Sequence, residues 1–324
     1  MTPLIERYRS RLPVGDDAEL VTLGEGSTPL LWAPRLSKRV HMDVWLKCEG
    51  ANPTGSFKDR GMTVAVTLAK ADGVRAVVCA STGNTAASSA AYAARAGLPA
   101  LVLQPAGAVA LGKLAQAMAL GAKVLEVRGT FDEALAAARA LADRGTHALV
   151  NSLNPYRIQG QKTAAFEIVD ELGNAPDVLA LPYGGGGNTC AYEIGFEEED
   201  DLPRIVSVQA TERSRTAASA IRIADPVHHA EVDAALERSG GEIVTVSDDQ
   251  ILDAWRLLAH EEGVFCEPAS AAGLAGLLAG EPERGACAVV VVTGSGLKDP
   301  ETASRLSPQP IAVDPDPDAI AAVA

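Results

Sequence analysis

Short runs of aliphatic and β-branched residues alternate along this chain with alanine- and leucine-rich runs that have helical periodicity. Within 248–263, for example, Ile251, Trp255 and Leu258 recur at i, i+4 and i+7, which places them on one face of a helix. Apolar strands that alternate with helices predict an α/β fold, in which open parallel sheets carry helices on both faces. The segment 287–294 is the most apolar, so we expect it in the centre of its sheet. The expected strands are 76–81, 100–105, 123–129, 177–183, 204–210 and 287–294, and the expected helices include 85–97, 131–145 and 248–263.

Length and charge narrow the class of protein. A length of 324 residues suggests about two domains, and a hydrophobic content of 47% is sufficient for a substantial core. The 28 basic and 42 acidic residues give a net charge of −14, which argues against a nucleic-acid partner because such binding requires clustered Lys and Arg. The N-terminal segment has charges where a signal peptide requires an apolar core, and the apolar run 286–293 is too short to cross a bilayer. We therefore expect a cytoplasmic protein that does not enter a membrane.

The cysteines give no sign of a disulfide framework or a metal site. They are scattered singly, without C-x-x-C spacing, and mostly in apolar surroundings. This pattern is typical of unpaired thiols in a reducing cytosol. The five residues are Cys48, Cys79, Cys190, Cys266 and Cys287.

Three loops that follow predicted strands are rich in glycine and hydroxyl groups. In open parallel sheets, ligands bind beyond the carboxyl ends of the strands, where such loops lie. The first loop contains Ser81, Thr82, Asn84 and Thr85 and leads into an alanine-rich helix. Its side chains and the free backbone N–H groups at the helix N-terminus could bind a carboxylate or a phosphate. The alternative is an ordinary helix N-cap.

The second loop has four consecutive glycines, Gly184, Gly185, Gly186 and Gly187, followed by Asn188. Consecutive glycines cost conformational entropy, so we expect the backbone here to approach a ligand closely. Their N–H groups would form an anion nest at a helix start, suited to a phosphate. Neither the P-loop pattern nor the G-x-G-x-x-G pattern is complete here, which argues against a nucleotide. The third loop begins at Thr293, after the most apolar strand, and could also be a plain tight turn.

Lys58 lies at the end of the turn-rich segment CEGANPTGSFKDRG. Ser56 and Asp59 have the spacing of a capping box, which places Lys58 in the first turn of a helix. The positive end of the helix dipole and partial burial both lower the pKa of a lysine, which suits a nucleophilic amine. The alternative is a lysine with a solvated head beside Asp59. A poised lysine, a glycine nest and a hydroxyl–amide loop together are the parts needed to hold pyridoxal 5′-phosphate.

Several segments resemble threonine synthases, which belong to the fold-type-II pyridoxal-phosphate enzymes together with the tryptophan synthase β chain and threonine dehydratase. The resemblance extends from about Leu23 to Pro300. The segments are NPTGSFKDRG, ASTGNTAASSAAYAARAG, NSLNPYRIQGQKTAAFEI, EEGVFCEPASAAGLAGL and VVTGSGLKDP.

The resemblance implies a role for each matching residue. Lys58 would bind the cofactor covalently and then act as the proton shuttle, Asn84 would bind the 3′-oxygen of the pyridine ring, and Thr293 would face the pyridine nitrogen. The cofactor phosphate would be bound by Gly184, Gly185, Gly186, Gly187 and Asn188. The substrate carboxylate and neighbouring groups would be bound by Ser81, Thr82 and Thr85, and the phosphate of the substrate by Lys113, Ser152, Asn154 and Arg157.

The implied architecture has two domains with the cofactor between them. The smaller domain, for the substrate carboxylate, would span 51–149, and the larger, for the cofactor phosphate, would combine 1–50 with 150–324. The implied partners are a second copy of the chain in a homodimer and an amino-acid substrate that carries a phosphate.

The implied reaction converts O-phospho-L-homoserine and water into L-threonine and phosphate. Three departures from the family pattern concern the substrate side. Gly185 stands where the family usually has an asparagine, Ser295 stands where it often has His or Asn, and the segment 211–215 is short. Alternative functions are dehydration of threonine or serine, replacement at Cβ of an O-activated serine, turnover of a changed substrate by a paralogue, or binding without turnover.

Overall fold

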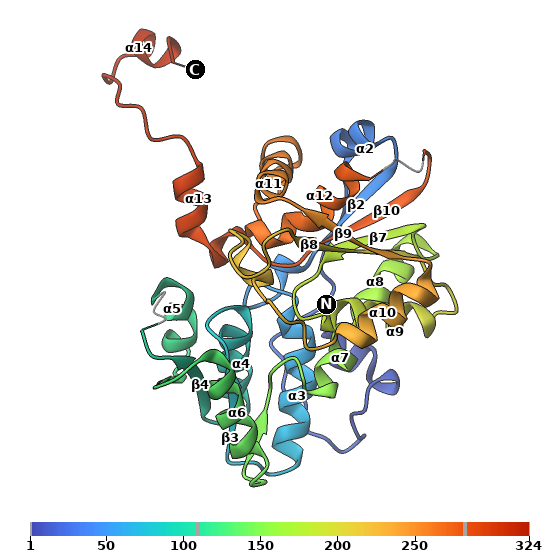
Figure 1. The fold of residues 1–324 in the computed structure, drawn as a ribbon, viewed down its shortest axis with the longest axis vertical. Coiled ribbons are helices and arrows are strands. Elements are labelled where there is room, and N and C mark those ends of the chain that lie inside the picture. The colour runs from blue at the N-terminus through green and yellow to red at the C-terminus, as the bar shows by residue number, and fades with distance from the viewer. Residues whose placement is uncertain (1, 108–110, 281–283, 324) are drawn as a thin grey trace.

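The computed structural model describes residues 2–107, 111–280 and 284–323, and it contains two separate sheets (Figure 1). The first is six-stranded in the order β1-β2-β10-β7-β8-β9, and the second is four-stranded in the order β5-β4-β3-β6. The strands of the larger sheet are β1 Leu30–Trp32, β2 Asp43–Cys48, β7 Val178–Pro182, β8 Arg204–Ala210, β9 Glu242–Val246 and β10 Cys287–Val292. Those of the smaller sheet are β3 Ala76–Ala80, β4 Ala100–Pro105, β5 Lys123–Val127 and β6 His147–Leu149.

Almost every strand pair is parallel, as the sequence predicts. The exception is β1, which pairs antiparallel with β2 at the edge of the larger sheet. β10 lies inside this sheet and pairs in parallel with both β2 and β7. The expectation that the most apolar strand is internal is thus confirmed, as is the expectation of open parallel sheets, to which β1 adds one antiparallel edge strand.

Helices cover both faces of each sheet, because side chains alternate between two apolar cores along the central strands. On β7, Val178 and Ala180 belong to one core with residues of α2, α11 and α12, whereas Leu179 and Leu181 belong to another with residues of α8, α9 and α10. β3 alternates in the same way between a core with α3, α4 and α5 and a core with α6. The helices flanking the larger sheet are α2 Pro34–Val40, α8 Thr163–Leu172, α9 Gly187–Glu197, α10 His229–Ser239, α11 Asp248–Glu262 and α12 Ala272–Ala279. Those flanking the smaller sheet are α3 Lys58–Ala71, α4 Asn84–Ala96, α5 Leu111–Ala119 and α6 Phe131–Ala142.

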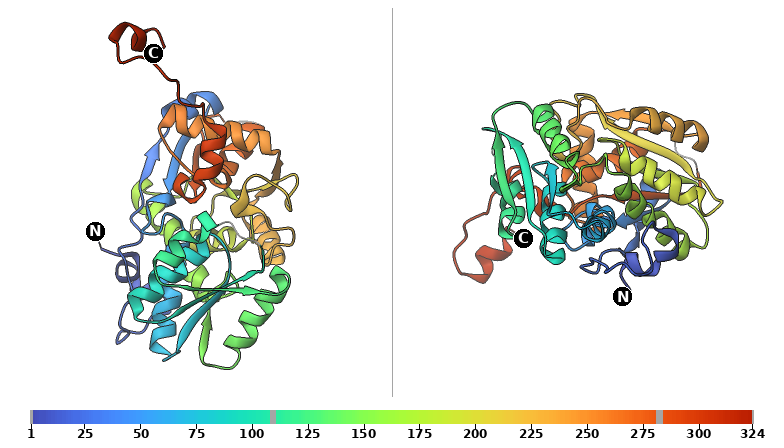
Figure 2. Two further views of the ribbon diagram at one scale, coloured as in Figure 1. Left: turned by 90° about the vertical axis from the view of Figure 1, so that its left-hand side faces the viewer. Right: turned by 90° about the horizontal axis from the view of Figure 1, so that it is seen from below.

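The remaining helices are short or lie outside these layers. The C-terminal segment with α14 projects away from the body in Figure 1 and in both views of Figure 2. The helices are α1 Leu4–Arg7, α7 Pro155–Gln161, α13 Pro300–Leu306 and α14 Pro317–Ala321. The smaller sheet lies wholly within 76–149 and the larger within 30–48 and 178–292, which supports the division into domains 51–149 and 1–50 with 150–324 that we propose.

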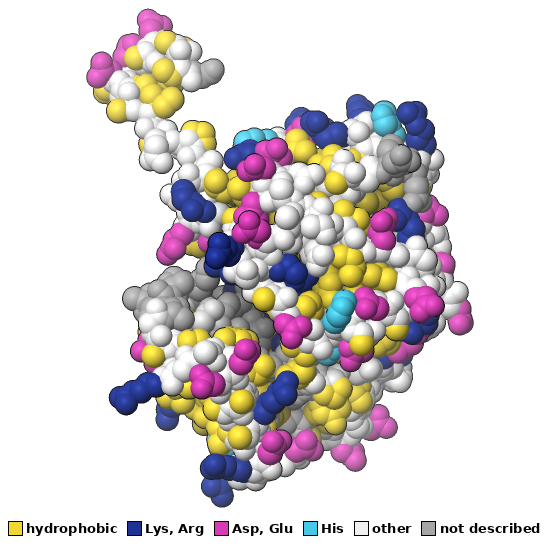
Figure 3. All heavy atoms as spheres, viewed as in Figure 1, with side chains coloured by type: hydrophobic (Ala, Val, Ile, Leu, Met, Phe, Trp, Pro, Cys, Tyr) yellow, Lys and Arg dark blue, Asp and Glu magenta, His cyan; other side chains and the backbone are white. Residues whose placement is uncertain are grey.

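The charged side chains of the visible surface do not form a single basic face (Figure 3). On the face shown in Figure 3, Lys and Arg side chains are scattered among acidic ones, with some gathered around α2. In the described part of the chain, no helix is long and apolar enough to span a bilayer, and no cluster of three His, Cys, Asp or Glu could hold a metal. All five cysteines are free.

Candidate active site

The loops predicted to carry chemistry all lie at the carboxyl ends of strands. β3 and β6 are neighbours in the smaller sheet, so the loop from Ser81 and the loop from Asn151 leave the same edge. β7 and β10 are neighbours in the larger sheet, so the glycine loop and the loop from Thr293 also leave one edge. The register of these parallel pairs therefore gathers the predicted residues into two groups, one for each sheet.

Lys58 is the first residue of α3, and the segment before it is fastened to the loop from Thr293. Phe57 N donates to Thr293 O at 3.0 Å, and Ser295 N donates to Gly55 O at 2.9 Å. Ser56 and Gly294 also form an isolated antiparallel bridge. These backbone contacts join the start of α3 to the end of β10, although more than two hundred residues separate them in sequence. They position Lys58 beside the edge of the larger sheet.

The amine of Lys58 has a strongly altered pKa. Burial of the amine, together with the nearby guanidinium of Arg157, lowers the pKa of Lys58 from 10.5 to about 7, while the carboxylate of Glu267 acts in the opposite direction. Part of the side chain nevertheless remains accessible. The sequence prediction of a lysine with a lowered pKa in the first helical turn is confirmed, so a large fraction of this amine is neutral near pH 7.

The predicted capping box between Ser56 and Asp59 is wrong. Phe57 is the N-cap of α3 and makes no side-chain capping bond. The carboxylate of Asp59 instead accepts bonds from Thr54 N and Thr54 Oγ1, both at 2.6 Å, and from Ser88 Oγ at 2.6 Å. Burial raises the pKa of Asp59 to about 6 in spite of these bonds. Asp59 thus ties the start of α3 to its own preceding loop and to α4.

Asn84 lies at the start of α4 and is held by Glu267. Asn84 Nδ2 donates to Glu267 Oε1 at 2.7 Å, and both side chains are buried. A Cβ added at Gly294 would lie 2.4 Å from Glu267 Oε1 and 3.5 Å from Asn84 Nδ2, so only glycine fits between them. The contact fixes the amide of Asn84 beside the loop that follows β10. Glu267 also raises the pKa of Lys58. Lys58, Asn84 and Glu267 therefore form one cluster.

Thr293 ends the apolar strand β10 and is paired with Ser270. The two hydroxyl oxygens lie 2.8 Å apart, and Gly294 N donates to Ser270 Oγ at 2.8 Å. Both side chains are buried. A neutral hydroxyl is therefore fixed at the end of the strand, and no carboxylate occupies the position.

The glycine loop has the geometry of an anion nest. Gly186 has a φ of +91° and is the N-cap of α9, so the first N–H groups of this helix are free of intrahelical partners. A Cβ at Gly185 would meet only Ile223, at 3.6 Å, which leaves space beside the backbone. The buried amide nitrogen Asn188 Nδ2 has no hydrogen-bond partner among the described residues. Orphaned donors at a helix N-terminus fit a phosphate.

Arg157 is fully buried on α7, where this helix crosses α3. The two helices approach at Gly61 and Gly160, because a Cβ at Gly160 would lie 1.9 Å from Arg60 O and one at Gly61 would lie 2.5 Å from Arg157 O. Arg157 Nη1 donates to Val150 O at 3.2 Å, whereas its Nε and Nη2 have no partner within the described chain. Burial lowers the pKa of Arg157 to about 10, so the guanidinium is still charged near pH 7. A buried cation with two free donors fits an anionic ligand.

The other predicted substrate residues lie around these groups. Ser81 Oγ accepts a bond from Gly83 N at 3.3 Å, and Ser81, Thr82 and Thr85 are all partly buried. Asn154 is the N-cap of α7, and its amide nitrogen donates to Leu149 O at 2.8 Å. Its side chain is thus used to shape the loop that contains Ser152. Lys113 belongs to α5, but its side chain lies outside the described residues.

Four residues of the site were given no role by the sequence. Glu267 and Ser270 lie in the quoted segment EEGVFCEPASAAGLAGL, and the signal for them was an acid and a hydroxyl close to Pro268. Arg213 Nη2 donates to Gly184 O at 2.7 Å and so supports the glycine loop from the short segment 211–215. His228 contacts the same loop, and nothing in its local sequence indicates this.

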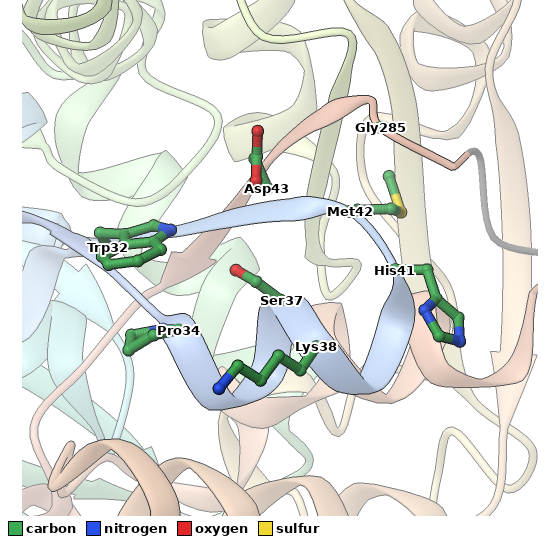
Figure 4. Close-up of a pocket in the computed structure, with 8 residues that line it drawn as sticks. All are labelled: Trp32, Pro34, Ser37, Lys38, His41, Met42, Asp43 and Gly285. Atoms are coloured by element: carbon green, nitrogen blue, oxygen red, sulfur yellow. The ribbon is translucent and has the colours of Figure 1, made fainter.

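A separate pocket of about 340 Å³ lies beside α2, between the end of β1 and the start of β10 (Figure 4). Trp32, Ser37, Lys38 and His41 are among its lining residues. It contains none of the residues predicted to bind cofactor or substrate.

Comparison with known proteins places these features in a family. The family described as pyridoxal-phosphate dependent enzyme matches residues 21–294. The chain belongs to this family, and within it to the threonine synthases.

Two curated relatives and one solved structure illustrate the similarity. The chain is 53% identical to the threonine synthase of Mycobacterium tuberculosis, over 96% of this chain and 93% of that protein. It is 52% identical to the threonine synthase of Synechocystis sp., over 94% of this chain and 85% of that protein. The crystal structure of a cysteine synthase from Entamoeba histolytica has a TM-score of 0.76 at 19% identity and covers 88% of this chain and 90% of that one, which shows the shared fold.

The family uses pyridoxal phosphate, and the residues of this chain fit that cofactor. They supply a buried amine at Lys58, an oriented amide at Asn84, an anion nest at 184–188 with an orphaned Asn188 donor, and a neutral hydroxyl at Thr293. The chain is therefore a pyridoxal-phosphate-dependent lyase of fold type II.

Proposed function

We propose that this enzyme converts O-phospho-L-homoserine and water into L-threonine and phosphate. The observation that carries the proposal is Arg157, a fully buried arginine with two unpartnered guanidinium nitrogens close enough to Lys58 to lower the pKa of its amine. A buried cation with free donors is costly unless a ligand supplies an anion. A planar guanidinium is well suited to phosphate, and the substrate of a dehydratase has no phosphate to offer.

We propose the following division of binding between the loops. The N–H groups of the glycine loop and Asn188 hold the cofactor phosphate, while Arg157, Ser152, Asn154 and Lys113 hold the phosphate of the substrate. Ser81, Thr82 and Thr85 hold the substrate carboxylate at the start of α4, where the helix dipole favours a negative charge.

Lys58 performs the proton transfers in this proposal. When bound, pyridoxal phosphate supplies an electron sink for the pair of electrons left at the substrate Cα. The neutral amine of Lys58 takes the proton from Cα, a proton is then removed from Cβ, and the phosphate leaves from Cγ. Of the two protons removed, one is returned to Cγ, which becomes the methyl group, and one is returned to Cα. Water supplies the hydroxyl at Cβ, and its remaining proton goes to the released phosphate. Arg157 compensates the charge of the departing phosphate, and Glu267 holds Asn84 in the orientation that its contact fixes. Thr293 offers a neutral hydroxyl, so it does not favour a protonated pyridine nitrogen, which moderates the sink.

A second candidate is a related reaction on a different amino acid, such as dehydration of threonine or serine. The observation in its favour is the open space beside Gly185, where a Cβ would meet only Ile223. The same space fits a changed substrate side chain.

Assays of the purified holoenzyme with O-phospho-L-homoserine, L-threonine and O-phospho-L-serine, run side by side, test the proposal. We expect threonine and phosphate from the first substrate and little turnover of the other two. Turnover of threonine or phosphoserine at a higher kcat/KM than phosphohomoserine would favour the second candidate.

We also propose a cytoplasmic homodimer whose smaller domain closes over the substrate and excludes water until elimination is complete. Free cysteines support a reducing compartment. Sedimentation of the holoenzyme tests the dimer, for which we expect about twice the chain mass of 33.5 kDa.

A further inference from the structure

We propose that His228 is a positioning residue that joins the cofactor-phosphate nest to the loop 151–154 for the substrate phosphate. The inference rests on the proposed function for the identity of the second anion. Its physical basis is a set of contacts that His228 makes in both directions, from a single buried position just before α10.

Toward the nest, His228 packs against three successive glycines. His228 N donates to Gly185 O at 3.1 Å. A Cβ at Gly186 would lie 3.0 Å from the His228 Cβ, and a Cβ at Gly187 would lie 3.5 Å from the imidazole ring. The backbone of His228 therefore holds the nest at Gly185, and its ring lies at van der Waals distance from the Cβ position of Gly187.

Toward the substrate side, the ring of His228 reaches the loop that follows β6. His228 Nε2 lies 3.0 Å from Ser152 O. A carbonyl oxygen can only accept, so Nε2 must carry the proton, which fixes the tautomer of a neutral ring. The other ring nitrogen, Nδ1, lies 3.9 Å from the exposed carboxylate of Glu231.

The loop 151–154 is tied to the smaller sheet through other residues. Asn151 exchanges two bonds of 2.9 Å with the backbone of Ala80, and Asn154 Nδ2 donates to Leu149 O. The bond from His228 therefore connects a loop of the smaller sheet to a loop of the larger one. Because Ser152 lies between Asn151 and Asn154, this bond sets where the loop stands relative to the nest, and hence the separation of the two phosphate sites.

The test compares His228→Ala with His228→Gln in the holoenzyme. Glutamine can place an amide N–H near the position of Nε2, so it can restore the bond to Ser152 O. For His228→Ala we expect the KM for O-phospho-L-homoserine and the inhibition constant of inorganic phosphate to rise about 10-fold, with kcat changed less than about 3-fold. For His228→Gln we expect both constants within about 3-fold of the parent enzyme.

His229→Ala is the matched control. His229 is exposed, and its contacts are to Asp233 and the hydroxyl of Tyr183, neither of which lies in the loop 151–154. We expect parental constants for this variant.

Two readouts are independent of turnover: the dissociation constant of pyridoxal phosphate, and the ³¹P resonance of the bound cofactor as inorganic phosphate is added. We expect the resonance to respond to inorganic phosphate in the parent and the glutamine variant and to lose that response in His228→Ala. If the parent fails to convert phosphohomoserine, the proposed function is wrong, but the resonance still tests the coupling. An equal response of the resonance in the parent and in His228→Ala would overturn the role of His228. So would an equal rise of the KM and of the inhibition constant in His228→Ala and His228→Gln.

Discussion

The amine of Lys58 shows how surroundings select one lysine for chemistry. Burial and the positive charge of Arg157 both favour the neutral form, and the negative charge of Glu267 limits the effect, so the pKa settles at about 7. A lysine in water is almost fully protonated at that pH and reacts poorly with an aldehyde.

The rate at which the apoenzyme binds pyridoxal phosphate covalently should therefore depend on pH around 7. The neutral amine is the reactive form, so the rate should rise as the pH passes through about 7 and then level off. Glu267→Gln removes the charge that raises this pKa, so the rise should move to lower pH. Stopped-flow absorbance measures the rate of covalent cofactor binding by the parent apoenzyme and by the Glu267→Gln apoenzyme at each pH. A rate that keeps climbing toward the ordinary lysine pKa of 10.5 would contradict the environment described for Lys58.

Arg157→Ala should strongly reduce the turnover of the phosphorylated substrate and should not affect reactions on amino acids that carry no phosphate. We expect a loss of about 100-fold or more in kcat/KM for O-phospho-L-homoserine, because hydrogen bonds to a charged group are worth about 1.5–3 kcal/mol each and two donors are lost. Arg157→Lys keeps the charge but not the planar fork, so it should recover only part of the loss. Steady-state kinetics measure the effect, and an unaltered kcat/KM in Arg157→Ala would mean that no substrate phosphate binds there.

At the scale of elements, the crossing of α3 and α7 brings Lys58 and Arg157 together. Gly160 lies at the closest approach, where a Cβ would be 1.9 Å from a backbone oxygen of α3. Gly160→Ala must push the helices apart, so we expect a loss of about 1–3 kcal/mol in the free energy of unfolding and a lower kcat/KM. Gly15→Ala is the control, because a Cβ at Gly15 has no neighbour within 4 Å. Urea denaturation measures both variants, and equal stability of the two would show that the helices do not require this contact.

A buried ionic network holds α3 to α8 and β2. Glu167 on α8 accepts bonds from Arg60 at 2.8 and 2.6 Å and lies 2.9 Å from the amine of Lys47. In spite of an opposing effect of burial, these two cations lower the pKa of Glu167 to about 2. A carboxylate with a lowered pKa stabilises the fold above its ordinary pKa of 4.5, and this contribution is lost as the pH falls through about 2.

Glu167→Gln should consequently lower the free energy of unfolding by about 3–5 kcal/mol at pH 7, since it removes the buried carboxylate that Lys47 and Arg60 share. Among the described residues, Arg60 then keeps only Glu49 as an ionic partner, and Lys47 keeps only the exposed Glu171. The deficit relative to the parent should shrink as the pH is lowered below 4.5. Glu171→Gln on the same helix is the control. Glu171 is exposed, and the substitution removes only its 3.5 Å contact with the amine of Lys47. Denaturation at several pH values measures the difference, and a deficit that does not vary with pH would contradict the lowered pKa of Glu167.

The sequence predicts the strands with long apolar runs, together with the exposed edge strand β5, and misses β1, β2, β6 and β9. The strands at 76–81, 100–105, 204–210 and 287–294 match β3, β4, β8 and β10 closely, because continuous apolar runs are distinctive. β1 and β6 have three residues each, too few for a periodic pattern, and β2 contains a buried lysine, Lys47, whose charge is balanced only in the folded state. The capping box at Ser56 failed for a similar reason, since Thr54 and Ser88 compete for Asp59.

At the scale of the whole molecule, the site depends on contacts between distant segments. The sequence could nominate Lys58, Asn84, the glycine loop, Arg157 and Thr293 because each lies in a motif of its own. It could not nominate Glu267 as the partner of Asn84 or His228 as the partner of Ser152, because these pairs form only when the two sheets are in place. Motifs thus identify the groups that meet ligands, whereas the residues that orient those groups are visible only in three dimensions.

Borohydride reduction of the holoenzyme, followed by mass spectrometry of its peptides, tests the central claim most directly. Borohydride makes the bond between cofactor and amine permanent, so the modified lysine can be identified. We predict a pyridoxyl-phosphate group on Lys58 alone, with loss of the visible chromophore on reduction and no label in Lys58→Ala. Labelling of a different lysine, for example Lys298, whose pKa is also lowered by burial, or no label at all, would contradict the account.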